Sequence, residues 1–168
     1  MSAGRRPELD ATYSDANAQP TPWNEASAAL EEAGVYWMVT VRRDERPHVT
    51  PVAGAWVDDA FYFSTGPGEQ KSKNLESNAN VVVVTGCNEF EDGLDVVVEG
   101  TAVVVTDAST VELLAKTLND KYDNYFGFAA QDAKFVHEAG GSANVYVVVP
   151  AKTFAYARGA TYSATRYR

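Results

Sequence analysis

The amino-acid sequence predicts a mainly β protein (α+β) in which about six or seven antiparallel strands form a barrel flanked by about three helices. Segments rich in valine and aromatic residues follow one another with short polar turns between them, for example at Asp58-Asp59, which is the pattern of antiparallel strands. A single long segment, from Asp107 to about Tyr122, has clear helical spacing. Because helices do not alternate regularly with strands, this order indicates a barrel rather than βαβ units.

The first expected element is a helix over residues 21–33. Thr21 can cap its start with a hydroxyl, Pro22 suits the first helical position, and the glycine that follows residue 33 ends it. Residues 1–20 are small and polar and are expected to form a flexible arm. Residues 21–168 then form a single domain, which is long enough to bury a core.

The expected strands carry long valine runs. The valines do not alternate with polar residues, which is typical of strands covered on both faces. Few helices are available to cover this apolar surface, so we expect a homodimer that packs sheet against sheet. The second strand should be interrupted near Pro51 and Gly54. The expected strands are 35–42, 47–57, 60–65, 80–85, 94–106, 144–150 and 152–157.

The long helix should begin with a cap at Asp107 or Ser109, and Glu112 lies three residues beyond Ser109 as in a capping box. The segment after this helix, residues 123–141, is ambiguous, and a short helix is expected near Asp132–Glu138. Trp37 and Trp56 are expected in the core, and His137 on the exposed short helix.

Composition excludes several classes of function. The 168 residues carry a net charge of −9, which argues against nucleic-acid binding as the main role. No apolar run approaches the roughly 20 residues of a membrane-spanning helix, and the N-terminus lacks the apolar core of a secretory signal. Cys87 stands alone, so a reducing cytoplasm is the default location. With only His48 and His137 beside it, a zinc site has too few ligands.

The segment from Phe61 to Val84 predicts an anion site. Ser64 and Thr65 end a strand with two hydroxyls, and the turn Gly66-Pro67-Gly68 bends the chain back. Lys71 and Lys73 follow at the start of a short helix, whose free N–H groups also favour anions. These groups together suit a phosphate, although an exposed turn with solvated lysines explains the same residues equally well.

Three segments in this order, Tyr36–Val41, Arg46–Val52 and Phe61–Asn74, resemble the pyridoxamine 5′-phosphate oxidase-like split β-barrel superfamily. The resemblance runs from about Val35 to the C-terminus. The closing residues Ala164–Arg168 look most like the B-type oxidoreductases that use the deazaflavin coenzyme F420. The resemblance implies an FMN-binding-type split barrel and a homodimer with its cofactor groove between the subunits.

The resemblance also implies which residues hold the cofactor. Thr65 and Lys71 match the hydroxyl and the base that contact the flavin phosphate, and the strand containing Pro51 matches the one that lies along the flavin ring. Cations of the C-terminal strand would join them if that strand reaches the groove. The implied cofactor residues are Thr50, Pro51, Val52, Ser64, Thr65, Lys71, Lys73, Asn74, Arg158 and Arg166.

Departures from the family pattern reduce the number of cofactors that fit this sequence. The phosphate-gripping arginine of FMN-binding members is replaced in the Val49-Thr50 region, and Gln70 stands where an arginine usually precedes the lysine. The substrate-holding tryptophan and Arg-Leu-His elements of true oxidases are missing from residues 154–168. A true pyridoxamine phosphate oxidase is therefore disfavoured. The longer anion of F420, with a phosphodiester and an oligoglutamate tail, suits several separated cations.

The implied activity is hydride transfer from reduced F420 to a small planar unsaturated acceptor, with no catalytic side chain identified. Two alternatives remain: an FMN-dependent oxidoreductase of the same fold, and a non-catalytic module that binds flavin or haem, with His48 or His137 as axial ligand. Tyr125 is one possible proton source. For Tyr125, Phe126 and Phe128, core packing is favoured over a lid on the substrate face.

Overall fold

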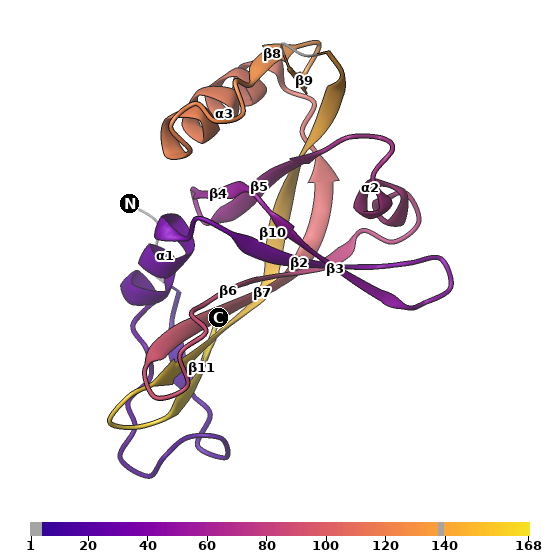
Figure 1. Ribbon diagram of the computed structural model, residues 1–168. Helices are drawn as coiled ribbons and strands as arrows, with labels where there is room; N and C mark the ends of the chain where they lie inside the picture. Colours follow the sequence, from indigo (N-terminus) through magenta and orange to yellow (C-terminus); the bar gives the residue numbers. More distant parts are fainter. Residues whose placement is uncertain (1–4, 138–139) are drawn as a thin grey trace.

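Strand β10 (Ser142–Arg158) is the centre of the fold, because it pairs with four other strands. The computed structural model describes residues 5–137 and 140–168 (Figure 1). The strands form one sheet in the order β1-β11-β10-β7-β6-β2-β3; β5 and β9 also pair with β10, and they pair in turn with β4 and β8. All of these pairings are antiparallel, which confirms the predicted mainly β architecture.

From β2 to β7, the boundaries of the strands agree closely with those expected from the sequence. Strand β10 replaces two expected strands, and its register shifts between Pro150 and Lys152. Proline cannot donate to a ladder, so it is tolerated at such an irregularity. The strands are β1 (Pro7–Leu9), β2 (Tyr36–Val41), β3 (Pro47–Val52), β4 (Gly54–Val57), β5 (Ala60–Thr65), β6 (Asn80–Thr85), β7 (Gly93–Val104), β8 (Ala129–Gln131), β9 (Lys134–Val136), β10 and β11 (Ser163–Tyr167).

Helix α1 (Trp23–Glu32) begins later than expected. Pro22 is its N-cap, and no side chain caps it, so the predicted hydroxyl cap at Thr21 is wrong. The Thr21 backbone is held by the last strand instead. Its N–H donates to Thr165 Oγ1 at 2.9 Å, and its carbonyl accepts from Tyr167 Oη at 2.9 Å.

Helix α3 (Ala108–Lys121) is the long helix that the sequence predicts. Asp107 caps it by accepting from the Thr110 N–H at 2.7 Å, and the Ser109 hydroxyl donates to the same carboxylate. These bonds from Ser109 and Thr110 lower the pKa of Asp107 to about 2. The predicted apolar face is buried at Val111, Leu114, Ala115 and Leu118.

Two other expectations are wrong. The segment expected as a short helix near Asp132 is the hairpin of β8 and β9, whose turn residues Asp132 and Ala133 have positive φ; Glu138 lies outside the described residues. The part of the expected flexible arm at Pro7–Leu9 is strand β1, which pairs with β11. Figure 1 shows α3 and the β8–β9 hairpin at one end of the molecule, with β11 and the C-terminus towards the other.

The core consists of two clusters of buried side chains, one that includes Tyr36, Phe61 and Phe63 and another that includes Leu118, Phe135 and Val145. The valine run of β6 alternates, with Val81 and Val83 buried and Val82 and Val84 half-buried, as expected for successive side chains of a strand. Val103 and Val104 are both exposed, so within one chain the valine runs are not covered on both faces as expected. The largest fully buried side chains are Tyr36, Phe61, Phe63, Phe135, Leu30 and Met38.

Candidate functional site

A groove of about 350 Å³ opens where β3, β5 and α3 approach one another. Five of the predicted cofactor residues line it: Pro51, Val52, Ser64, Thr65 and Lys71. They come together because β5 ends at the Gly66-Pro67-Gly68 turn and α2 (Gln70–Leu75) then brings Lys71 back beside the strand end. The other lining residues are Ala53, Gly66, Glu69, Leu118, Phe126, Phe128, His137, Gly141, Ser142 and Ala143.

The polar end of the groove gathers the donors expected for an anion. The side chain of Lys71 is only 10% exposed, and its ammonium forms an ion pair with the Glu69 carboxylate. Glu69 Oε1 also accepts from the Gly66 N–H at 2.8 Å, and the Thr65 hydroxyl, 3.5 Å from the Gly66 carbonyl, lies near the same carboxylate. We call Thr65, Gly66 and Lys71 the anion cradle. Burial raises the pKa of Glu69, but the bonds from Lys71, Gly66 and Thr65 outweigh it and hold that pKa below its ordinary value.

Asn74 does not face the groove as expected. It is 1% exposed, and its amide is bonded on both sides: Nδ2 donates to Thr40 Oγ1 at 2.8 Å, and Oδ1 accepts from Gln70 Nε2 at 2.8 Å. These bonds fasten α2 to β2 and thereby fix the position of Lys71. Thr50 lies next to the groove residue Pro51, and its Oγ1 is buried without a hydrogen-bond partner among the described residues.

A second hollow of about 500 Å³ lies between α2 and the turn that joins β2 to β3. We call it the basic hollow, because Arg42, Arg43, Arg46 and Lys73 line it together with Asp44, Gln70, Asn74 and Glu76. Arg46 is paired with Asp44 at 2.7 Å, whereas the other three cations form no ion pair among the described residues. Lys73 therefore belongs to this hollow and not to the groove where it was expected.

The basic hollow and the groove are neighbours. His48 is close enough to both to respond to each: burial lowers the pKa of His48, and the positive charges of Arg42 and Lys71 lower it further. Strand β3 thus carries the groove residues Pro51 and Val52 and also His48, which responds to Lys71 of the groove and to Arg42 of the basic hollow. None of the three arginines of the hollow was predicted as a site residue, and Arg42 was expected to end the strand 35–42. The signal that could have found them is the pair Arg42-Arg43 next to a strand expected at the cofactor.

The C-terminal arginines lie away from this groove in the same chain. Asn144 of β10 pairs with Thr65, and Arg158 lies 14 residues further along β10, roughly 45 Å at the usual rise per residue. There Arg158 forms an ion pair with Asp95, and its Nε donates to the Glu89 carbonyl at 3.0 Å.

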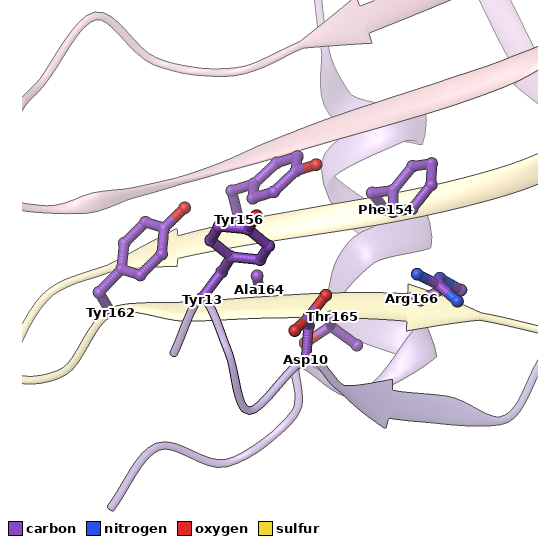
Figure 2. Close-up of a pocket in the computed structure, with 8 residues that line it drawn as sticks. All are labelled: Asp10, Tyr13, Phe154, Tyr156, Tyr162, Ala164, Thr165 and Arg166. Atoms are coloured by element: carbon purple, nitrogen blue, oxygen red, sulfur yellow. The ribbon is translucent and has the colours of Figure 1, made fainter. Parts of the chain in front are cut away.

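Arg166 lines a second pocket, of about 300 Å³, at that distant end (Figure 2). Its guanidinium carbon lies 5.9 Å from the centre of the Phe154 ring. Figure 2 shows Phe154 on the Arg166 side of this pocket and Tyr162 on the opposite side, with Tyr13 and Tyr156 between them. Asp10, Ala164 and Thr165 complete the lining.

An outward row of side chains connects the two ends of the sheet. Directly paired residues of an antiparallel sheet share one face. The pairs Pro51↔Trp37, Trp37↔Val84, Val84↔Val97, Val97↔Phe154 and Phe154↔Arg166 therefore form one continuous row from the groove to the second pocket. Trp37 is 52% exposed, so its expected place in the core is wrong, whereas Trp56 is buried as expected.

Aromatic side chains form part of the lining of the groove. Phe126 and Phe128 are half-buried groove residues stacked at 5.0 Å, and Phe128 also stacks on the core residue Phe135 at 4.6 Å. Tyr125 is 83% exposed. The favoured core interpretation is therefore wrong for Tyr125 and incomplete for the two phenylalanines. His137 is half-buried against Phe128 in the groove, not on an exposed helix.

A family model described as pyridoxamine 5′-phosphate oxidase matches residues 23–155. No curated protein matches the sequence. None of the described helices is both long and apolar enough to cross a membrane.

Solved structures of low sequence identity share the fold. A conserved hypothetical protein from Mycobacterium tuberculosis has a TM-score of 0.66 at 16% identity, with 87% of each chain covered. A protein named F420 reductase has a TM-score of 0.57 at 22% identity, covering 76% of this chain and 94% of that one. The FAD binding protein from Mycobacterium smegmatis has a TM-score of 0.54 at 18% identity, covering 86% and 96%. These likenesses confirm the split-barrel fold that the resemblance implied.

Proposed function

The chain belongs to the pyridoxamine 5′-phosphate oxidase family, and from this premise we propose that it is an oxidoreductase that uses the deazaflavin coenzyme F420 to reduce a small planar acceptor. The observation that carries the proposal is the neighbouring arrangement of the groove, with its anion cradle, and the basic hollow. The fold relatives include proteins named for F420 and for FAD, so the family membership alone leaves the cofactor open.

The groove suits a flavin-like ligand in both its halves. Pro51, Val52 and Phe126 offer apolar surface for a planar ring. Lys71 and the Gly66 N–H already hold a carboxylate, which supports their use for the anionic group of a ligand. The unpartnered Thr50 hydroxyl beside the groove is one further polar atom without a bond inside the described chain.

The basic hollow favours F420 over FMN. FMN ends at one phosphate, which the anion cradle alone can hold. F420 continues into a tail of carboxylates. Arg42, Arg43 and Lys73, which form no ion pair within residues 5–137 and 140–168, offer positive charge in the neighbouring basic hollow. The second candidate, an FMN-dependent oxidoreductase, is favoured by the cradle itself, since three donors converge there on one anion.

When bound, the reduced cofactor supplies a hydride. The work of the chain is then to orient the ring, to exclude water with Phe126 and Phe128, and to leave one face open for the acceptor. Tyr125 is exposed at the mouth of the adjoining hollow, which Phe126 also lines, so it remains a proposed proton source alongside solvent.

We further propose a homodimer through the outward row. Trp37 and Val49 are each 52% exposed on this face, and half-buried valines surround them. An apolar band of this kind is typical of an interface. Because the row ends at Pro51 in the groove and at Arg166 in the second pocket, a second copy packed across it in the opposite sense would bring Arg166 towards the groove. Such a dimer supports a role for Arg166 in binding the cofactor in the groove of the other subunit. Within one chain, Arg166 lies too far from the groove for this role.

The test is a side-by-side fluorescence titration with F420, with the deazaflavin ring compound that lacks the phosphate and tail, and with FMN. We expect F420 to bind most tightly and the truncated compound to bind at least tenfold more weakly than F420, as loss of one charged contact already predicts. Tighter binding of FMN than of F420 would move the assignment to the second candidate. Binding of neither cofactor would reject both.

A further inference from the structure

The anion cradle is occupied by the chain's own Glu69. One carboxylate oxygen accepts from the Gly66 N–H at 2.8 Å, the other pairs with Lys71, and the Thr65 hydroxyl lies near the same group. The Gly66 N–H and the Lys71 ammonium, which would meet a ligand phosphate at this point, are therefore already bonded to a carboxylate. Glu69 and Lys71 together have no net charge, so the cradle in this state attracts an anion weakly.

The two partners differ in their freedom to move. The Lys71 side chain is 10% exposed and lies on α2, which Asn74 fastens to β2. The Glu69 side chain is 50% exposed and lies in the loop before α2. The backbone turn does not depend on the carboxylate, because the Glu69 N–H donates to the Gly66 carbonyl at 3.1 Å. The carboxylate can therefore leave by rotation of its side chain while the lysine and the turn remain in place.

We propose that Glu69 is an internal competitor for the anion cradle, displaced when the phosphate group of a ligand enters, and that it thereby sets how tightly phosphate-bearing ligands bind. The inference deepens the proposed function and rests on it only in assuming that a ligand phosphate enters the groove at Lys71. Phosphate-bearing ligands must break the bonds of Glu69, whereas flavins without a phosphate need not. Glu69 consequently reduces the gain in affinity that a ligand would otherwise obtain from its phosphate group.

The substitution Glu69→Gln tests this directly. Glutamine keeps the size of the side chain and an acceptor for the Gly66 N–H, but it removes the charge that Lys71 holds. The matched control is Glu112→Gln, which removes an exposed carboxylate of α3 that lines neither the groove nor the basic hollow. Lys71→Met and the double variant with Glu69→Gln show whether any gain depends on Lys71.

The probes are inorganic phosphate, FMN and riboflavin, measured by calorimetry and by the amide NMR signal of Gly66. We expect Glu69→Gln to bind inorganic phosphate and FMN about tenfold more tightly than the wild type, with riboflavin affinity unchanged. Glu112→Gln should change each affinity less than twofold, and the gain should disappear in the double variant. The Gly66 signal should move with phosphate at lower concentration in Glu69→Gln.

Several results would overturn the proposal. Weaker phosphate binding by Glu69→Gln would make Glu69 a ligand contact, and equal gains in Glu69→Gln and Glu112→Gln would reduce the effect to overall charge. The same measurements separate a failure of the proposed flavin function from a failure of the Glu69 proposal. If inorganic phosphate responds to Glu69→Gln but FMN and F420 do not bind, the competitor stands and the flavin function does not. If inorganic phosphate binds neither protein, the competitor is rejected whatever the flavins do.

Discussion

Asn74 donates a hydrogen bond to Thr40 at 2.8 Å, and both residues are almost completely buried. This bond joins the short helix that carries Lys71 to a central strand, so the groove depends on an interaction beneath it. Replacing Asn74 with alanine would leave the amide of Gln70 and the hydroxyl of Thr40 without their short bonds. Only contacts of 3.5 Å to His48 would remain for Thr40.

We expect Asn74→Ala to lower the free energy of unfolding by about 1–3 kcal/mol, the cost of leaving a buried polar group unpaired. Urea denaturation measures this. The control is Asn80→Ala, which removes an exposed side-chain amide that donates to Asn78 Oδ1 at 3.0 Å, and for which we expect a change within about 0.5 kcal/mol. Similar losses in the two variants would show that the buried bond contributes nothing specific.

Lys71→Ala should weaken the binding of a phosphate-bearing cofactor by about 1.5–3 kcal/mol, the range for a hydrogen bond to a charged group. The comparison is with Lys73→Ala, which removes a lysine of the basic hollow two residues away. Lys73→Ala should affect F420 but leave FMN nearly unchanged. Unchanged affinity of a folded Lys71→Ala protein for both cofactors would show that the cradle is not the phosphate site.

The paired substitution Arg42→Gln and Arg43→Gln tests the basic hollow. Neither arginine has an ion pair among the described residues, so the change removes charge without breaking one. We expect weaker binding of F420, a smaller dependence of that binding on salt, and no change for FMN. Titrations at two salt concentrations measure all three. Equal losses for FMN and F420 would indicate a general effect of charge and not a site for the tail.

Lys121 should give the protein a distinctive dependence on pH. Burial lowers the pKa of Lys121 from 10.5 to about 8. Between these values the unfolded chain binds a proton that the folded protein does not, so this residue makes stability rise as pH increases from about 8 towards 10.5. Burial also raises the pKa of Tyr36 above its ordinary 10.0, which opposes the rise at higher pH, so the scan should stop at about pH 9.5.

Thermal denaturation of the wild type and of Lys121→Met across this range measures the effect. We expect the difference in melting temperature between the two proteins to shift in favour of the wild type as pH rises. The Lys121 ammonium also donates to the Glu31 carbonyl at 3.0 Å and to Tyr36 Oη at 2.8 Å. Because Lys121→Met removes these bonds, its melting temperature differs from that of the wild type at every pH, and the test is how this difference changes with pH. Parallel profiles would contradict the lowered pKa.

Trp37→Glu tests the proposed dimer by placing a charge in the middle of the outward row. We expect the wild type to be a dimer by light scattering and this variant to be a monomer, because burial of an unpaired charge at an interface is costly. Leu113→Glu is the control, since Leu113 is 61% exposed on α3 and outside the row. A monomeric wild type, or the same effect from both variants, would reject this interface.

Local sequence signals were sufficient for most elements and for half of the predicted site. Turn residues and strand composition locate β5, the Gly66 turn and Lys71, and all of these act over a few neighbouring positions. What could not be predicted depends on residues brought together from a distance. Arg42 gains its place beside Lys73 only when the β2–β3 turn packs near α2, and His137 faces the groove only because β9 pairs with β10.

The outward position of Trp37 shows a related limit. From its residue type alone, an apolar residue of an expected strand is assigned to the core. The pleat of the strand, however, decides on which face of the sheet its side chain lies. Glu69 was overlooked for a different reason. Its contacts with Gly66 and Lys71 come from a side chain that folds back across its own turn, and residue type alone does not indicate that direction.

The large sequence separation between paired strands has a consequence for synthesis. Strand β5 is complete at Thr65, yet its partner β10 begins at Ser142, and β1 pairs with β11. Such long-range pairing makes folding slow, since distant segments must meet before they are stabilised. On the ribosome the growing chain would carry open strand edges until β10 and β11 have been synthesised. Protection of those edges during synthesis is therefore a requirement that this topology places on the cell.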